Sequence, residues 1–513
     1  MSEKLVRGGY VVTDASKLPG EGLIEDGAVA VVGDRIAAVG PYAELKARYA
    51  DAEELGSDRH VVIPGLVNTH HHGWGLSSFQ LGFVDDYLEA WIPDIWQMKV
   101  VDAYLDTLWA DMRNIRSGVT TLLHAAYGRD WSNYEGETRA KLRAHADSGI
   151  RAAYAVHTLD QHLFVYQDDR EFLQRLPDGL GEHIGEILAE MHLAGADDFF
   201  ALTERLRDEY ADHPRITIMM CPVAPQWCSD GLLREIRERA TGWEMAIHLH
   251  CLESPYQREF GRSSYGESTV EHLDRMRFLG PDVSFGHAVW LTETDMSICA
   301  DTGTSVCHNA SSNLRLRVGI LPAALLLEKG VNVSIGMDGT ALNDDEDMLQ
   351  ELRLVAKLHR LPRGIPHVAC PTSFDVLRMG TANGARSLSM DRAIGKLEEG
   401  YKADIVLVDS DPFVKPYLDP RVNIVDALLY RARGMDVDTV LIDGAVVLRE
   451  RSFVDLDENE ILRSLVESAE AEPTQLTARW TKALQDLKPH VVRFYEDYER
   501  PAYEPCYTVN SLT

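Results

Sequence analysis

Two histidines one residue apart, His70 and His72, follow the apolar run VVIPGLV of residues 61–67. A run of Val, Ile and Leu predicts a buried β-strand, and residues two apart on a strand project to the same side. Both imidazoles are therefore expected to converge at one strand end, where they can begin a metal site. By the same parity His71 points away from this site and is not expected to bind.

Other apolar runs along the chain also end in a histidine or an aspartate. Each such residue alone is more often a structural group than a ligand, but their joint appearance at strand ends indicates a shared site. The residues at these ends are His124, His157, His248, His250, His287, His308 and Asp338.

Four of these side chains make a coherent ligand set for one divalent metal ion: His70, His72, His250 and Asp338. Imidazole nitrogen and carboxylate oxygen suit zinc, which we expect, or iron as the alternative. His250 lies nearer the end of its strand than His248, for which we predict a packing or supporting role. The fourth run, ITIMMCPV, carries no lysine to bridge two metals, which favours a single ion.

Two further residues are predicted to act on the reacting molecule. Glu253 follows His250 by three residues and can reach a metal-bound water without binding the metal, which is the position of a general acid and base. His287 is placed either to hydrogen-bond that water or a developing oxyanion, or to bind the metal as a fifth ligand. The sequence does not separate these two roles.

The elements that carry these residues predict an α/β fold. About eight β-type runs alternate with helical stretches from residue 61 to residue 339, which is the pattern of a (β/α)₈ TIM-like barrel. The alternative is an open doubly wound sheet. No GxGxxG follows the first strand, and the polar residues gather at many strand ends rather than at one crevice. The barrel is therefore favoured.

Short strands precede and follow the predicted barrel, with hairpin signals at Gly33-Asp34 and Asp443-Gly444. They predict a small β-sandwich domain built from both chain ends. The expected domains are residues 1–63 (first part of the β domain), 64–389 (the barrel), 390–453 (second part of the β domain) and 454–513. This last segment is predicted to be a helical extension that serves contacts within a homo-oligomer.

Composition limits the partners. Of 513 residues, 45% are hydrophobic, and the formal net charge is −30, which argues against nucleic acid or an anionic membrane as a partner. Seven scattered cysteines fit a reducing compartment. There is no signal-peptide pattern and no apolar run as long as a membrane span. We therefore expect a cytoplasmic protein that acts on a small molecule.

Several motifs occur in an order that resembles the amidohydrolase superfamily. They are PGLVNTHHH, SGVTT, HLHCLES, GHAVWLT, SSNLRL, GMDGTALNDDEDMLQELRL, TANGARSL and GKLEEGYKADIVLVD. The chain is most similar to the mononuclear branch that contains triazine hydrolases, cytosine deaminase and S-adenosylhomocysteine deaminase. This resemblance covers roughly residues 5–450 and implies the same barrel, a small β domain from both chain ends, and hydrolytic attack on a ring carbon that bears an amine or a halide.

The resemblance also implies roles for individual residues. His70, His72, His250 and Asp338 match the ligands, Glu253 the proton shuttle, and His287 the contact to water or substrate. Members that deaminate S-adenosylhomocysteine tend to carry HSPYT after the fourth strand, where this chain has Val223 in place of the histidine. Nucleoside deamination is therefore less expected.

Aromatic and polar residues near the site are candidates for substrate contact. Trp74 and Trp91 lie in the Trp-rich segment after the first strand, and Gln226 follows the fourth. The two indoles can wall an apolar or aromatic ligand.

The function predicted from the sequence is that of a metal-dependent hydrolase of C–N bonds other than peptide bonds. Asp338 and Glu253 accept the proton of a water activated by the metal, and Glu253 returns it to a ring nitrogen or a leaving amine. An aminohydrolase (deaminase) of a nitrogen heterocycle is the first choice. The alternatives are a hydrolase of an amide, urea or carbamate, a dechlorinating triazine-type hydrolase, and a binding protein on a decayed barrel.

Overall fold

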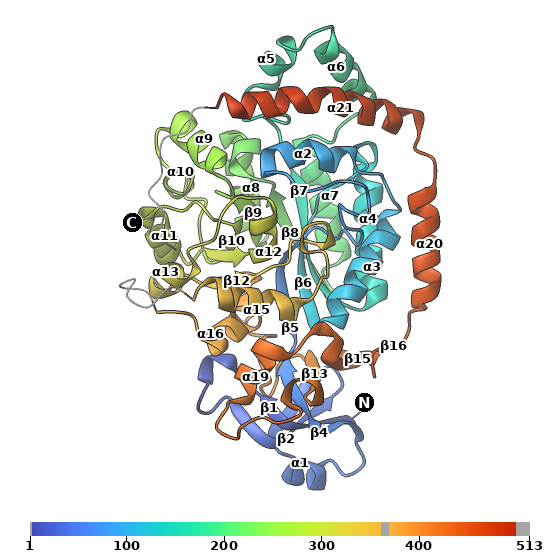
Figure 1. Ribbon diagram of the computed structural model, residues 1–513, viewed down its shortest axis with the longest axis vertical. Helices are drawn as coiled ribbons and strands as arrows, with labels where there is room; N and C mark the ends of the chain where they lie inside the picture. Colours follow the sequence, from blue (N-terminus) through green and yellow to red (C-terminus); the bar gives the residue numbers. More distant parts are fainter. Residues whose placement is uncertain (1–2, 361–368, 499–513) are drawn as a thin grey trace.

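Eight parallel strands form the centre of the computed structural model, which describes residues 3–360 and 369–498 (Figure 1). Neighbours in sequence are neighbours in this sheet, from β5 to β12. The sheet curls into a nearly closed barrel, and across the seam the Asp338 N–H donates to the His70 carbonyl at 2.9 Å. The strands are β5 (Leu66–His71), β6 (Val119–Ala125), β7 (Arg151–Thr158), β8 (Ile216–Pro222), β9 (Ile247–Cys251), β10 (Val283–His287), β11 (Ser305–His308) and β12 (Val333–Ile335).

Helices follow the strands and cover the outside of the barrel, so the strands are buried on both faces and can be apolar throughout. The α-helices of the described chain, of which α1 packs on strands of the terminal sheet rather than on the barrel, are α1 (Tyr42–Arg48), α2 (Leu88–Gln97), α3 (Ala103–Arg116), α4 (Tyr134–Ser148), α5 (Asp169–Gln174), α6 (Leu180–Met191), α7 (Ala196–Glu209), α8 (Asp230–Gly242), α9 (Pro255–Tyr265), α10 (Thr269–Arg275), α11 (Glu293–Thr302), α12 (Ala310–Arg315), α13 (Ala323–Glu328), α14 (Thr340–Asn343), α15 (Met348–Leu358), α16 (Ser373–Met379), α17 (Ala382–Ser387), α18 (Asp411–Val414), α19 (Ile424–Arg431), α20 (Glu458–Glu470) and α21 (Gln475–Glu496). The predicted (β/α)₈ barrel is confirmed.

Strands from both chain ends form a second sheet of eight strands, at the bottom of Figure 1. Its order is β16-β15-β14-β13-β4-β1-β2-β3, and it is mixed, because β1 pairs parallel with β4 while β13 pairs antiparallel with β4. The strands are β1 (Glu3–Val12), β2 (Leu23–Val32), β3 (Arg35–Pro41), β4 (Glu53–Pro64), β13 (Ile405–Asp409), β14 (Val437–Ile442), β15 (Ala445–Arg449) and β16 (Ser452–Phe453). A small β-sandwich domain made by both chain ends was predicted, and the strands of both ends do join, in this one mixed sheet.

The run VVIPGLVNTHHH, which the sequence predicts as one barrel strand, is two strands in the structure. Residues 61–64 end β4 of the terminal sheet, and β5 of the barrel begins at Leu66. Gly65 joins them where the backbone passes close to Thr120, since a Cβ at Gly65 would lie 2.0 Å from the Thr120 hydroxyl. The change of sheet therefore occupies one residue, and hydrophobicity does not reveal it because both strands are buried.

The last two helices lie outside both sheets. In Figure 1 α20 runs along one side of the barrel, and α21 crosses above α2 and below α5 and α6. Lys488 of α21 contacts Asp94 of α2 at 2.6 Å, and Tyr495 accepts a hydrogen bond from the Tyr166 N–H at 3.2 Å. The predicted extension thus covers its own barrel, while residues 499–513 lie outside the described part of the chain. No helix among the described residues is long and apolar enough to cross a membrane.

Candidate metal centre

Five side chains converge at the C-terminal ends of the barrel strands. His70 and His72 come from the end of β5, His250 from β9, His287 from β10, and Asp338 from the turn after β12. One ligand atom each of His70, His72 and His250 lie within 4.8 Å of one another, as do those of His70, His287 and Asp338. The structure therefore brings together all the residues that the sequence predicts as ligands, with His287 beside them.

The carboxylate of Asp338 lies at the centre of this group. Its Oδ1 is 3.2 Å from His70 Nε2 and 3.1 Å from His72 Nε2, and its Oδ2 is 3.8 Å from His287 Nε2. The Ser312 hydroxyl donates to Oδ2 at 2.6 Å and fixes the orientation of the carboxylate. Asp338 adopts a φ of 66°, a left-handed conformation that is uncommon for a residue other than glycine and recurs at functional sites.

Hydrogen bonds at Nδ1 orient the histidine rings. His72 donates to the Ala125 carbonyl and His250 to the Val223 carbonyl, each at 2.8 Å. Nδ1 of His287 likewise lies 2.8 Å from the side-chain oxygen of Asn313. When Nδ1 carries the proton, the lone pair of Nε2 points toward the cluster, which is the arrangement of a histidine ligand.

His70 is oriented by a second histidine. Its Nδ1 lies 2.7 Å from Nε2 of His248, whose own Nδ1 lies 2.8 Å from the Ser284 hydroxyl. Proton donation along this chain, from His70 to His248 and from His248 to Ser284, leaves Nε2 of His70 free to bind. His248 thus lies behind the cluster, where a supporting role was predicted for it.

Two atoms at the centre test whether these residues fit a metal ion. Nε2 of His70 and Oδ1 of Asp338 are buried and have no hydrogen-bond partner within the described chain. Burial lowers the pKa of His70 well below its usual value and that of His250 to about 3, so both rings are neutral. Neutral imidazoles around a carboxylate match a divalent metal site.

Glu253 lies beside the cluster and is buried. Its Oε1 is 3.5 Å from Nδ1 of His287, and its backbone N–H donates to the Gln257 side chain at 2.9 Å. Burial, together with the negative charges of Asp338 and Glu89, raises the pKa of Glu253 well above the ordinary value for a glutamate. A carboxyl group with a raised pKa can hold and release a proton near neutral pH.

A small cavity of about 60 Å³ opens onto these groups, and we call it the metal cavity. Trp74 and Trp91, both predicted as substrate contacts, line it, whereas Gln226 is not among its lining residues and Trp227 is. Gln226 and Trp227 belong to a single 3₁₀ turn (Pro225–Trp227), in which successive side chains point about 120° apart. The other lining residues are His72, Leu88, Ile92, Ile95, Tyr127, Val223, His250, Glu253, His287, Leu316, Asp338 and Leu342.

Trp74 also contacts a metal-site histidine. Its ring stacks on His72 at 5.1 Å, and the guanidinium carbon of Arg129 lies 5.1 Å from the centre of its ring. Arg129 is buried, and Asp106 lies 3.5 Å from it. Asp106 in turn accepts the N–H groups of Gly75 and Leu76, which follow Trp74. Sequence reasoning missed this support, because Asp106 and Arg129 are far from Trp74 along the chain.

His71 faces away from the cluster. The Gly73 N–H donates to its Nδ1 at 2.8 Å, and its Nε2 lies 2.5 Å from the Glu346 carboxylate. Asn114 and Thr340 also donate to Glu346. His71 is therefore held in a buried polar network on the other side of β5, as strand parity predicts.

Comparison with known proteins places this geometry in a family. The profile of the Amidohydrolase family matches residues 61–447, which include every residue of the cluster. The chain belongs to the amidohydrolase family. The predicted resemblance is thereby confirmed, and with it the enzyme class, a hydrolase of C–N bonds.

Amidohydrolases of similar length are among its relatives. The chain is 33% identical over 484 residues to a 5'-deoxyadenosine deaminase of Methanosarcina barkeri, an alignment that covers 93% of this chain and 100% of the relative. It is also 33% identical over 447 residues to a 5-methylthioadenosine/S-adenosylhomocysteine deaminase of Syntrophobacter fumaroxidans, covering 85% and 92% of the two chains.

Solved structures share the fold. A zinc-bound adenosine deaminase from Xanthomonas campestris is 27% identical with a TM-score of 0.77, covering 91% of this chain and 98% of that one. A zinc complex of the atrazine chlorohydrolase TrzN from Arthrobacter aurescens TC1 has a TM-score of 0.74 at 20% identity, covering 91% and 100%. At that identity the likeness shows the fold alone.

Proposed function

We propose that this amidohydrolase is a zinc-dependent aminohydrolase that removes an amino group from the ring carbon of a nitrogen heterocycle. The observation that carries the proposal is the buried carboxyl of Glu253, with its raised pKa, beside a cluster of neutral histidines and one aspartate. The deaminase relatives support it, since they align over most of their length.

The cluster fits one divalent ion held by His70, His72, His250 and Asp338. Zinc suits neutral imidazole and carboxylate ligands, and two of the similar solved structures contain it. When bound, the metal supplies a Lewis acid that lowers the pKa of water. Metal analysis of the natively purified protein tests the assignment, and stoichiometric iron in place of zinc would overturn it.

The side chains then divide the proton transfers. Asp338, ionised at neutral pH, accepts a proton from the attacking water, and Glu253 delivers one to the ring nitrogen or to the leaving amine. His287 with its proton on Nδ1 presents a lone pair at Nε2, which favours a role as ligand or as acceptor from water over a role as donor to an oxyanion. Trp74, Trp91 and the apolar side chains of α2 exclude bulk water and pack against the ring.

A substrate panel tests the reaction. We expect the metal-loaded protein to release ammonia from aminated purines, pyrimidines or triazines. The proposal would be contradicted if no aminated ring yields ammonia while ureas, carbamates or anilides release an amine, or chlorotriazines release chloride. Adenosine-type nucleosides belong in the same panel, because Val223 places an apolar side chain in the wall of the metal cavity and we expect free heterocycles to be preferred.

Three further expectations stay predictions: a homo-oligomer, a cytoplasmic location and the absence of a nucleic-acid partner. We propose the predicted limits, with a change of domain near residues 63, 389 and 453, as the domain boundaries. Analytical ultracentrifugation of the full chain measures its oligomeric state, and a monomer at micromolar concentration would contradict the first of these expectations.

A further inference from the structure

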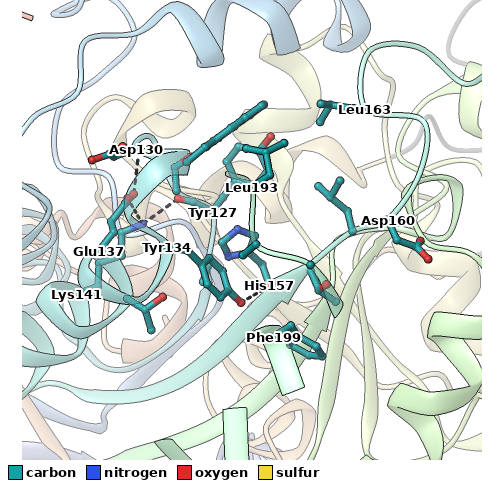
Figure 2. Close-up of a pocket in the computed structure, with 18 of the residues that line it drawn as sticks. Tyr127, Asp130, Tyr134, Glu137, Lys141, His157, Asp160, Leu163, Leu193 and Phe199 are labelled. Carbon is teal, nitrogen blue, oxygen red and sulfur yellow. Dashed lines mark hydrogen bonds and ion pairs between the residues drawn. The ribbon is translucent and has the colours of Figure 1, made fainter. Parts of the chain in front are cut away.

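A second, larger cavity lies next to the metal cavity, with Tyr127 lining both. Its volume is about 270 Å³, against about 60 Å³ for the metal cavity. The walls come from the segment between β6 and α4, the end of β7 and the loop after it, and the start of α7 (Figure 2). We call this the second cavity.

Aromatic rings make up much of its wall. Tyr127, Trp131, Tyr134 and Phe199 all line it. Trp131 is held by a hydrogen bond from its indole N–H to the Gly128 carbonyl at 3.1 Å, and its ring packs against Trp96 and Trp480 at 5.5 and 5.6 Å. The Trp131 ring is therefore held in place without a ligand.

The charges in the wall are mostly negative. Asp130, Glu137, Asp160 and Asp169 line the cavity, and Lys141 is the one cation among its lining residues. The Lys141 ammonium lies 2.8 Å from Glu137 and donates to the Tyr127 carbonyl at 2.9 Å, so it compensates one carboxylate. Three carboxylates remain without a cation to balance them in the wall.

The remaining carboxylates are held by hydrogen bonds from the backbone. Oδ1 of Asp130 accepts from the Ser132 N–H at 3.2 Å and from the Ser132 hydroxyl at 2.6 Å. Asp169 accepts the N–H groups of Leu163 and Phe164. Figure 2 shows Asp130 and Asp160 on opposite sides of the labelled aromatic rings. Asp160 is exposed and accepts the N–H and the hydroxyl of Ser229, each at 2.6 Å, so these carboxylates lie at the margins of the aromatic cavity.

His157 adds an unused polar atom. In Figure 2 it lies between Tyr127 and Tyr134, and its ring is 5.9 and 5.1 Å from theirs. Its Nδ1 is buried and has no hydrogen-bond partner within the described chain. Burial lowers the pKa of His157 to about 4, so the ring adds no positive charge. Arg129, the residue before Asp130, does not line the cavity, and its guanidinium lies against Asp106 and Trp74.

We propose that the second cavity binds a small organic cation, a protonated amine or quaternary ammonium group carried on an apolar or aromatic body. Aromatic faces attract such a cation through the ring quadrupole, and nearby carboxylates add Coulomb attraction. A carboxylate or phosphate ligand is repelled by the same wall. The cation is either a free molecule or the part of the substrate remote from the reacting ring, since Tyr127 is common to both cavities.

Calorimetry on the full chain, with metal removed by a chelator, tests the proposal without relying on the proposed reaction. We expect benzyltrimethylammonium to bind and the matched anion 3-phenylpropionate to bind at least tenfold more weakly. Equal binding of the two probes, or no heat from the cation at millimolar concentration, would overturn the proposal.

Two variants locate the binding. Asp130→Asn removes the charge but keeps an oxygen for Ser132, and we expect it to weaken benzyltrimethylammonium binding roughly fivefold. The matched control is Asp457→Asn, which keeps the oxygen that accepts the Glu460 N–H at the start of α20 and lies outside the lining of the second cavity. The same affinity in both variants would place the cation elsewhere and overturn the assignment.

Kinetics then separate the two sources of the cation. With the metal-loaded enzyme, benzyltrimethylammonium raises KM without changing kcat if part of the substrate occupies the second cavity. If the cation is instead a separate molecule, benzyltrimethylammonium does not change the KM of a substrate that occupies only the metal cavity. Because binding is measured first on the metal-free protein, failure of the deaminase proposal leaves the cation site standing, and the reverse also holds.

Discussion

The metal cavity and the second cavity share one wall residue and differ in almost every other respect. The metal cavity is small, and its histidine and aspartate side chains come from the ends of barrel strands and are held by buried hydrogen bonds. The second cavity is several times larger, and none of its charged groups comes from a strand: Asp130 and Asp160 lie in connecting segments, and Glu137, Lys141 and Asp169 lie in α4 and α5. The strand ends of the barrel thus fix the candidate metal ligands, whereas the loops and helices that follow the strands form the wall of the neighbouring cavity.

Removal of the metal is expected to produce the largest difference between the two cavities, because it should abolish turnover at one and leave cation binding at the other. Chelation, or the variant His72→Ala, should lower turnover by at least about 10³-fold, because the Lewis acid that activates water is lost. Binding of benzyltrimethylammonium should change less than twofold. Added zinc should restore the chelated protein but not His72→Ala. Elemental analysis checks that the metal has been removed completely. Turnover that survives this removal would show that the reaction does not depend on a metal in the metal cavity.

Glu253→Gln is the next largest change. It keeps the shape of the side chain but cannot carry the proton, so kcat should fall about 10²- to 10⁴-fold while metal content stays stoichiometric. Elemental analysis and steady-state kinetics on the same preparation measure both. Metal lost together with activity would show that Glu253 is a ligand rather than a proton carrier.

Arg129→Met tests whether the Arg129 guanidinium holds the Trp74 ring in place. Without the cation over its ring, Trp74 is held less firmly against His72, and we expect metal affinity to fall about tenfold, measured by competition with a chelating dye. Arg129→Lys keeps the positive charge, so its metal affinity should lie between that of the native protein and that of Arg129→Met. Unchanged metal affinity in both variants would show that Trp74 does not need this contact.

His71→Ala should have the smallest effect on the reaction, although it lies between two candidate ligands. It leaves the Glu346 carboxylate buried with only Asn114 and Thr340 as donors, so the free energy of unfolding should fall by about 3 kcal/mol. Metal stoichiometry should not change. Thermal denaturation and metal analysis measure the two effects, and metal loss as large as in His72→Ala would contradict the strand parity.

The sequence predicted the barrel and the converging residues, because alternation of β and helical runs is local and strand ends meet at one face. His70, His72, His250 and Asp338 were found in this way. It did not predict the division of residues 61–72 between two sheets, since both halves are equally apolar. Nor did it predict Arg129 against Trp74, or Trp227 rather than Gln226 in the cavity wall, because loop conformation decides these contacts.

The placement of α21 has a consequence for the order in which the molecule is made. Every candidate ligand lies at or before Asp338, whereas the helix that packs over α2 begins at Gln475 and is therefore synthesised after all of them. During synthesis α2, which carries four of the side chains that wall the metal cavity, therefore gains its covering helix only after every candidate ligand has been made.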